Sequence, residues 1–206
     1  MIKGFIFDFD GVIIDTNKYH FDSWKESLNL FKIDFDEKKY NQIKGLSRRK
    51  SLDFLNSEQN QLSEEKKDEL LKQKNNIFLD LIKDLKSDDL LPGVQDFIFN
   101  FKNTHKLGVA SSSKNAKYIL KKINFDHFFD VIVDGTMVLE SKPNPEVFLK
   151  CADLLNLKPE QCVVFEDSKN GILGAKKGGF FTYLIGGNIE FKNLADKFLK
   201  DLTYYK

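Results

Sequence analysis

The first apolar run of the chain covers residues 5–8 and leads into two carboxylates, at Asp8 and Asp10. Near-continuous hydrophobicity over so few residues is typical of a strand that is buried on both faces of a parallel sheet. Ligands of such sheets bind in the crevice beyond the carboxyl ends of the strands. The pattern therefore predicts a strand over residues 5–8 with both acids at its end. A simple Asp-x-Asp-Gly turn is an equally good interpretation of these residues alone, because Asp and Gly are common in turns.

The next stretch shows helical spacing of apolar positions and no strand pattern, as far as residue 85. An amphipathic helix is predicted over residues 16–31, where apolar side chains are spaced among charged ones. Further helices are expected to begin after Ser47 and Ser63, because serine suits the N-cap position. The polar residues 56–61 predict a loop within this helical block. Helices placed between the first strand and all later strands indicate a cap inserted into an α/β domain.

The rest of the chain alternates between helix and strand. Strands are predicted over residues 107–110, 131–133, 162–165 and 181–185, and helices over residues 94–101, 116–123, 145–155, 170–177 and 191–199. This alternation predicts a parallel sheet with helices on both faces. The expected fold class is α/β, with a Rossmann-like core formed by residues 1–15 and 87–206 and a helical cap formed by residues 16–86.

Length and charge narrow the classes of protein that fit. The chain has 206 residues and a formal net charge of +1, so no global charge favours a nucleic-acid or membrane partner. No apolar stretch is long enough to span a bilayer, and the N-terminus lacks a signal-peptide layout. Cys151 and Cys162 lie in apolar segments, which predicts buried reduced thiols in a cytoplasmic protein. A monomer is expected, because no helix shows a spare apolar face.

Three later strands also end in polar residues. Ser111 follows the second strand, Lys142 comes a short loop after the third, and the acidic pair Glu166-Asp167 follows the fourth. Each has an ordinary explanation, since serines cap helices, lysines are solvated and acids begin helices. Parallel strands nevertheless bring these side chains to one edge of the sheet. Clustered carboxylates repel one another, and a hard divalent cation such as Mg²⁺ is the partner that prefers their oxygens.

In their order along the chain, these residues resemble the motifs of the phosphotransferases of the haloacid dehalogenase superfamily. The aspartate pair, the hydroxyl, the lysine and the acidic pair all match, and the resemblance covers the whole chain. Further matches are similar to the β-phosphoglucomutase branch and lie at residues 8–12, 15–16, 19–20, 24, 44–48, 113–115 and 141–143. Ser112 and Leu46 depart from that branch, where alanine and valine are common.

The resemblance implies the roles of the catalytic residues. Asp8 would attack phosphorus and form an aspartyl phosphate, which splits one transfer into two. Asp10 would act as general acid and base, worth roughly 10²–10⁴-fold. Ser111 would hydrogen-bond the transferring phosphoryl group, and Lys142 would neutralise its charge.

The same resemblance implies a Mg²⁺ site. Carboxylates of Asp8 and Asp167 would bind the ion, together with the backbone carbonyl of Asp10. Glu166 would add a direct or water-mediated contact.

A mutase also needs a second phosphate site, away from the metal. Arg48 is the candidate in the cap, because a guanidinium can hold phosphate with two hydrogen bonds. Without the resemblance, residues 48–50 would be interpreted as a solvated basic helix start. The resemblance implies that the remaining substrate contacts come from Thr16, His20, Trp24, Gly45, Leu46, Ser113, Lys114 and Asn115. Closure of the cap about residues 15–16 and 86–90 would exclude water and limit the substrate to a small sugar phosphate.

The expected activity is that of a β-phosphoglucomutase, which interconverts β-D-glucose 1-phosphate and glucose 6-phosphate through a sugar bisphosphate. A Mg²⁺-dependent phosphatase of small sugar phosphates, with the same Asp8 chemistry, is the alternative. A phosphonate hydrolase is disfavoured because the cap offers no obvious Schiff-base lysine motif, and a dehalogenase because Asp10 would have no role. A non-catalytic binding module is disfavoured because every motif residue is present.

Overall fold

The computed structural model describes residues 1–59, 62–187 and 189–205. Within these residues one parallel sheet has six strands in the order β3-β2-β1-β4-β5-β6. The strands are β1 (Gly4–Phe7), β2 (Lys106–Ala110), β3 (Val131–Val133), β4 (Cys162–Glu166), β5 (Phe181–Ile185) and β6 (Lys197–Leu199). This is the strand order of a Rossmann-like sheet, and the predicted fold class is confirmed.

Strand β1 lies in the middle of the sheet, which explains its unbroken hydrophobicity. All four of its residues are buried. Its parallel register sets Phe7 opposite Val109 on one side and opposite Phe165 on the other. The next residue, Asp8, is therefore level with Glu166 at the carboxyl edge of the sheet.

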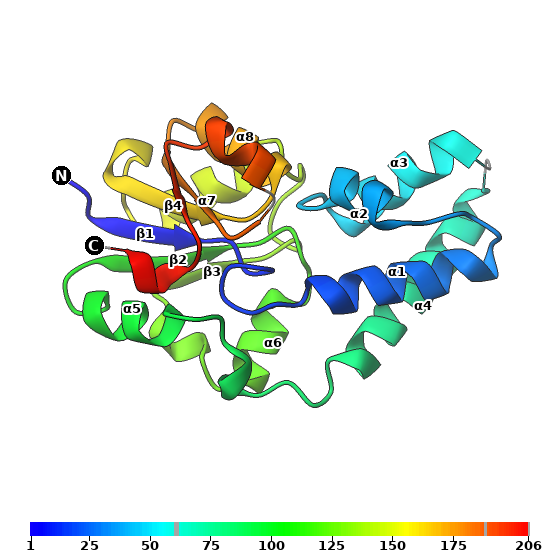
Figure 1. The fold of residues 1–206 in the computed structure, drawn as a ribbon, viewed down its shortest axis with the longest axis horizontal. Helices are drawn as coiled ribbons and strands as arrows, with labels where there is room; N and C mark the ends of the chain where they lie inside the picture. The colour runs from blue at the N-terminus through cyan, green and yellow to red at the C-terminus, as the bar shows by residue number, and fades with distance from the viewer. Residues whose placement is uncertain (60–61, 188, 206) are drawn as a thin grey trace.

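Helices cover the two faces of the sheet in pairs (Figure 1). They are α5 (Val94–Phe101), α6 (Ala116–Lys122), α7 (Glu146–Leu154) and α8 (Lys169–Lys177). Successive strand residues point to opposite faces, so Phe5 and Phe7 pack with residues of α5 and α6. Ile6 packs on the other face with residues of α7 and α8. We call this sheet with its four helices the core.

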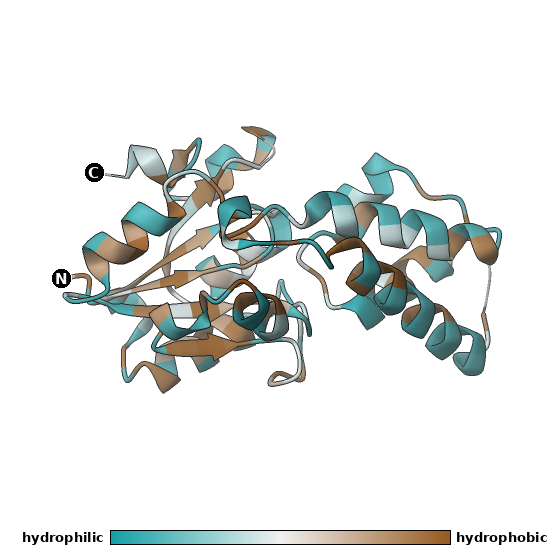
Figure 2. Cartoon of the chain, turned by 90° about the horizontal axis from the view of Figure 1, so that it is seen from below, coloured by the Kyte–Doolittle hydropathy of each residue, from teal (hydrophilic) through white to brown (hydrophobic). Residues whose placement is uncertain are grey.

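Four helices between β1 and α5 form a separate lobe, which we call the cap. They are α1 (Asn17–Leu30), α2 (Glu37–Ile43), α3 (Arg48–Gln59) and α4 (Glu64–Leu81). The cap has its own apolar centre, which includes Trp24, Leu28, Leu52, Leu55 and Leu70. Figure 2 shows brown apolar residues turned inward between these helices and teal polar residues outward. Figure 1 places the cap beside the carboxyl ends of the strands.

The chain enters and leaves the cap at one place. Ile14 and Leu90 form an antiparallel β-bridge, and the Leu91 amide donates to the Ile13 carbonyl at 2.9 Å. Two predicted hinge segments, residues 15–16 and 86–90, lie next to this bridge. The domain limits 1–15, 16–86 and 87–206 stay a prediction.

Two sequence-based expectations were wrong. Residues 191–199 do not form a helix: a 3₁₀-helix, Ile189–Leu194, is followed by strand β6. The Asp196 carboxylate accepts hydrogen bonds from the Thr182 amide (2.8 Å) and hydroxyl (2.9 Å), which holds this segment against β5. The expected loop at residues 56–61 does not begin at Asn56, because α3 continues to Gln59. Asn56 is buried, and its side chain accepts from the Leu62 amide at 3.0 Å. Residues 60–61 lie outside the described residues.

Among the helices that the structure describes, none combines the length and apolar character that crossing a membrane requires.

Candidate active site

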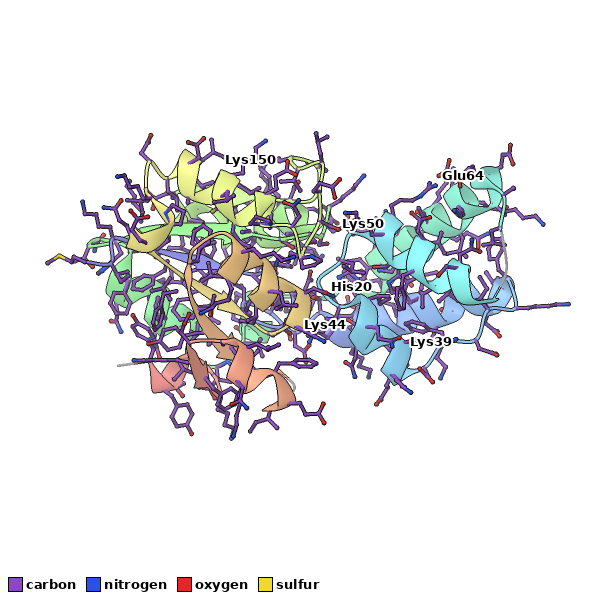
Figure 3. All side chains as sticks on the ribbon, turned by 90° about the horizontal axis from the view of Figure 1, so that it is seen from above. His20, Lys39, Lys44, Lys50, Glu64 and Lys150 are labelled. Atoms are coloured by element: carbon purple, nitrogen blue, oxygen red, sulfur yellow. The ribbon has the colours of Figure 1, made fainter. Side chains whose placement is uncertain are left out.

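A cavity of about 450 Å³ lies between the core and the cap. This volume suits a small polar ligand. The core contributes Asp8, Asp10, Ser113, Lys114, Lys142 and Asp167 to its lining, and the cap contributes His20, Trp24, Gly45, Leu46, Arg48, Lys74 and Asn75. Figure 3 labels His20, Lys44 and Lys50 on the part of the cap that faces the core.

At the sheet edge, a buried lysine joins two carboxylates. The Lys142 ammonium donates to Asp8 Oδ1 at 2.7 Å and to Glu166 Oε1 at 2.6 Å, and its side chain is fully buried. Burial raises the pKa of Asp8 well above its usual value; the negative charge of Glu166 adds to this, and the Lys142 ammonium opposes it. Burial would lower the pKa of Lys142, but the two carboxylates outweigh burial and raise it. Lys142 therefore keeps its charge beside Asp8.

Glu166 is held from both sides. Its second oxygen, Oε2, accepts from the Ser168 amide at 2.7 Å and from the Ser168 hydroxyl at 2.9 Å. A Cβ atom at Gly171, in the first turn of α8, would lie only 1.7 Å from Glu166 Oε1. Glycine at this position thus makes room for the buried carboxylate.

The carboxylates of Asp8, Glu166 and Asp167 could hold a divalent cation. One oxygen from each lies within 4.8 Å of the others. Asp167 Oδ2 accepts from the Lys44 ammonium (2.6 Å) and from Nδ2 of the Asn17 side chain (3.2 Å), whereas its buried Oδ1 has no partner among the described residues. Three hard oxygen donors, one of them without a partner, fit Mg²⁺. The predicted ligand from Asp10 is its backbone carbonyl, and the Asp10 side chain lies outside this carboxylate group.

The Asp10 carboxylate is instead bonded to residues at the start of α1. Its Oδ1 accepts from the Thr16 hydroxyl, and His20 Nε2 lies 3.3 Å away. His20 Nδ1 lies 2.8 Å from Lys74 Nζ. Because the ionised Asp10 carboxylate can only accept, Nε2 carries the proton that is directed at it, and Nδ1 accepts from Lys74.

This arrangement shifts the pKa values of both groups. Burial, and after it the charge of Lys74, lowers the pKa of His20 to about 4, so the imidazole is neutral at pH 7. Burial would raise the pKa of Asp10, but the interactions with His20 and Thr16 outweigh burial and lower it. Because neutral His20 carries no charge, hydrogen bonds are what hold the Asp10 carboxylate at neutral pH. A hydrogen-bonded carboxylate of this kind can exchange a proton with a bound substrate.

Lys74 lines the cavity but was not among the site residues predicted from the sequence. Its side chain is 1% exposed and lies over the rings of Phe78 (4.6 Å) and Trp24 (5.4 Å). Burial, followed by the charge of Arg48, lowers its pKa well below the usual value. The sequence did contain an indication that Lys74 is buried. Leu70, Lys74 and Phe78 are four residues apart, which places all three on the buried face of α4.

Hydrogen-bond donors from both lobes meet around Asn75, in a part of the cavity wall that we call its far end. Asn75 Oδ1 accepts from Arg48 Nη2 at 2.6 Å and from Asn115 Nδ2 at 3.0 Å. Ser113 and Lys114 line the cavity at this end, and the Ser113 hydroxyl accepts from the Asn115 amide at 3.2 Å. The structure therefore brings the predicted cap residue Arg48 and the predicted core residues 113–115 together.

Four predicted site residues do not line the cavity: Thr16, Ser111, Asn115 and Glu166. Each is buried directly behind a lining residue, to which it is hydrogen-bonded or adjacent in sequence. The Ser111 hydroxyl, for example, accepts from the Ser113 amide at 3.0 Å. Besides Lys74 and Asn75, the lining residues that the sequence analysis missed include Asn17, Tyr40, Lys44 and Arg49, although Lys44 lies within a matching segment.

The site combines a buried aspartate–lysine pair at the edge of a parallel sheet with a helical lobe that faces it. Residues 5–185 match the profile of the haloacid dehalogenase-like hydrolases, and the chain belongs to that family. It is a phosphotransferase or phosphatase of this superfamily.

Individual relatives point the same way. The chain is 38% identical over 189 residues to a β-phosphoglucomutase of Bacillus subtilis, covering 90% of this chain and 84% of the relative. It is 31% identical over 183 residues to a phosphorylated carbohydrates phosphatase of Thermotoga maritima, covering 86% and 82%. A crystal structure of a β-phosphoglucomutase from Clostridium difficile is similar over 100% of this chain and 94% of that one, with a TM-score of 0.94 and 36% identity.

Proposed function

We propose that the enzyme is a β-phosphoglucomutase, which interconverts β-D-glucose 1-phosphate and glucose 6-phosphate through a sugar bisphosphate. The observation that carries this proposal is a cavity lined by two separate cationic groups. Lys142 is bonded to Asp8 on the core, whereas Arg48 of the cap is bonded to Asn75, with Lys114 also in the lining. A sugar with two phosphates could use both groups, whereas a phosphatase needs only the one beside Asp8.

Chemistry at the core end follows from the positions of the acids. Asp8 would attack phosphorus in line, forming its own O–P bond as the bond to the donor oxygen breaks. On phosphorylated Asp8, the Asp10 carboxylate, held by Thr16 and His20, would take the proton of a sugar hydroxyl as that oxygen attacks phosphorus and the O–P bond to Asp8 breaks, which gives the bisphosphate. After the bisphosphate has turned over, Asp8 would attack its other phosphate, and Asp10 would return the proton to the departing sugar oxygen.

Lys142 would balance the charge that builds up on the phosphoryl oxygens. We propose that Mg²⁺ is the cofactor, held by Asp8 and Asp167, with Glu166 and the Asp10 carbonyl beside it. When bound, it would screen the repulsion between the Asp8 carboxylate and the phosphate dianion. The cap would keep water from the aspartyl phosphate, so that a sugar hydroxyl is the acceptor.

A phosphatase of small sugar phosphates is the second candidate, supported by the Thermotoga maritima relative. The two are separated by incubation with β-glucose 1-phosphate, Mg²⁺ and a trace of the 1,6-bisphosphate. A mutase makes glucose 6-phosphate faster than it releases inorganic phosphate. Release of phosphate as the main outcome would contradict the mutase proposal and favour the phosphatase.

Arg48→Ala tests the far end of the cavity. It should lower the rate of isomerisation much more than the hydrolysis of a simple phosphomonoester, because only isomerisation needs the second phosphate site. Lys67→Ala is the control, since that cap ammonium pairs with Asp53 and Glu64 and does not line the cavity. Equal effects of the two substitutions would remove Arg48 from the site.

A further inference from the structure

We propose that Asn75 is a positioning residue that makes the enzyme select substrates with a second anionic group. Its neutral amide fixes the Arg48 guanidinium without cancelling the positive charge. This inference rests on the proposed function, because it assumes that the far end of the cavity binds the second phosphate.

The geometry around Asn75 is specific. One oxygen accepts from Arg48 on α3 and from Asn115 in the core, so the side chain joins the two lobes at the cavity wall. Guanidinium groups have donors only, so the contact to Arg48 fixes which amide atom is the oxygen. The Asn75 NH₂ group donates to none of the described residues and belongs to a residue that lines the cavity.

Charge at this end is left uncompensated. Arg48 has no carboxylate within salt-bridge distance among the described residues, and it donates instead to the uncharged Asn75. The neighbouring Arg49 is bonded to Asp53, Glu64 and Asp68, which shows what acidic partners would do to the same group. Lys114 also lines the cavity. An anion bound beside Asn75 therefore meets the Arg48 guanidinium, which no carboxylate among the described residues neutralises.

Two substitutions of Asn75 distinguish its role in positioning Arg48 from its effect on the local charge. Asn75→Asp keeps an acceptor for Arg48 and Asn115, but it adds a negative charge beside the entering phosphate. Asn75→Ala removes the acceptor and leaves the charge of Arg48 intact. If Asn75 selects for anions, the aspartate variant should bind the second phosphate worse than the alanine variant does. A purely structural role gives the reverse order, because aspartate can still hold Arg48.

The test measures binding by calorimetry in an Asp8→Asn background, so that no turnover occurs. The ligands are glucose 1,6-bisphosphate, with two anionic groups, and phenyl phosphate, with one, both in the presence of Mg²⁺. Asn75→Asp should weaken bisphosphate binding by roughly 30- to 100-fold, where each tenfold corresponds to about 1.4 kcal/mol. Asn75→Ala should weaken it by about tenfold, and phenyl phosphate should change by less than about threefold.

Asn76→Asp is the matched control, because it adds the same charge at the next, exposed position of α4. The proposal is overturned if Asn75→Asp binds the bisphosphate like Asn76→Asp, or if both ligands lose affinity equally. If the aspartate variant fails to fold, the alanine variant decides, since unchanged bisphosphate affinity in it contradicts the proposal. Failure of the mutase proposal would be seen separately, as phosphate release by the wild-type enzyme, and the ratio of the two affinities would still test Asn75.

Discussion

The core wall and the cap wall of the cavity each bury a lysine, but the two lysines have different partners. Lys142 in the core is bonded to Asp8 and Glu166, and this surrounding raises its pKa. Lys74 in the cap is bonded to His20 and lies over aromatic rings, and burial lowers its pKa well below the usual value. The core thus pairs its buried lysine with carboxylates, whereas the cap surrounds Lys74 and Arg48 with neutral groups.

On the proposed function, the core wall and the cap wall of the cavity have different roles. A core wall with paired charges is suited to the attack on phosphorus, whichever molecule accepts the phosphoryl group afterwards. The Arg48 guanidinium of the cap, which has no acidic partner among the described residues, favours a substrate that brings an anion to it. On the proposed function, the choice between sugar and water as acceptor depends on the cap, and substitutions on the two walls should have different consequences.

The largest effect is expected at Asp8, the predicted nucleophile of the core wall. Asp8→Asn should lower both isomerisation and phosphate release by about 10⁴-fold or more, because an amide is not a nucleophile for phosphorus. The amide oxygen can still accept from Lys142, so the fold should persist. Glucose 6-phosphate and phosphate are measured side by side, with the exposed Asp84→Asn as control. Turnover that survives in Asp8→Asn would remove the nucleophile assignment.

The next effect compares the two lysines directly. Lys142→Met should lower the free energy of unfolding by about 3–5 kcal/mol, because it leaves the buried carboxylates of Asp8 and Glu166 without a counter-charge. Lys74→Met should change it by less than about 1 kcal/mol, since no carboxylate loses its partner and methionine packs well against rings. Urea unfolding at pH 7.5 without added metal measures both. Similar losses in the two variants would break the comparison.

A smaller effect concerns pH and the cap residue His20. Its pKa is about 4 in the folded chain, against 6.5 as the ordinary value. Between these values the unfolded chain binds a proton that the folded chain does not, so this contribution to stability is lost as pH falls from 6.5 towards 4. Between pH 7.5 and pH 5 the loss is about 2 kcal/mol. His20→Gln should remove that part of the pH dependence in urea unfolding, and identical slopes for the two proteins would rule it out.

The smallest effect is expected where the two lobes meet at the surface. Lys50 on α3 pairs with Glu140 in the core, and both side chains are about half exposed, at 45% and 53%. Pairs of this kind contribute about 0–1 kcal/mol and are screened by salt. Lys50→Ala should therefore shift thermal unfolding only slightly, and the shift should shrink in 0.5 M salt (about 4 Å of screening length). A large, salt-independent loss would mean that the contact does more than this geometry indicates.

Sequence alone predicted most of the core, for a physical reason. Strands of a parallel sheet are short apolar runs, and their carboxyl ends meet at one edge. Asp8, Ser111 and Glu166 could therefore be predicted from the sequence alone to lie close together. Strand β6 was missed because three residues, of which only Leu199 is partly covered, carry too little pattern. Its position depends on the distant pairing of Asp196 with Thr182, which local pattern does not reveal.

In the cap the sequence was less informative. Helix α4 carries several lysines, and only the spacing of Lys74 with Leu70 and Phe78 distinguishes the buried one. Asn75 and Asn76 are identical neighbours, and only the folded chain shows that the first contacts Arg48 while the second faces solvent. A helical face is a weaker guide than a strand end, because contacts to another lobe depend on how the lobes dock.

The β-bridge between Ile14 and Leu90 has a consequence for how proteins of this architecture can diversify. Because the two ends of the insertion are joined by this bridge, residues 15–89 form a single closed loop attached to the sheet. The entropic cost of closing such a loop grows only with the logarithm of its length. Homologous proteins can therefore differ in the length or identity of this insertion at little cost to the stability of the sheet. Such a change would alter the acceptor while the proposed nucleophile stays the same.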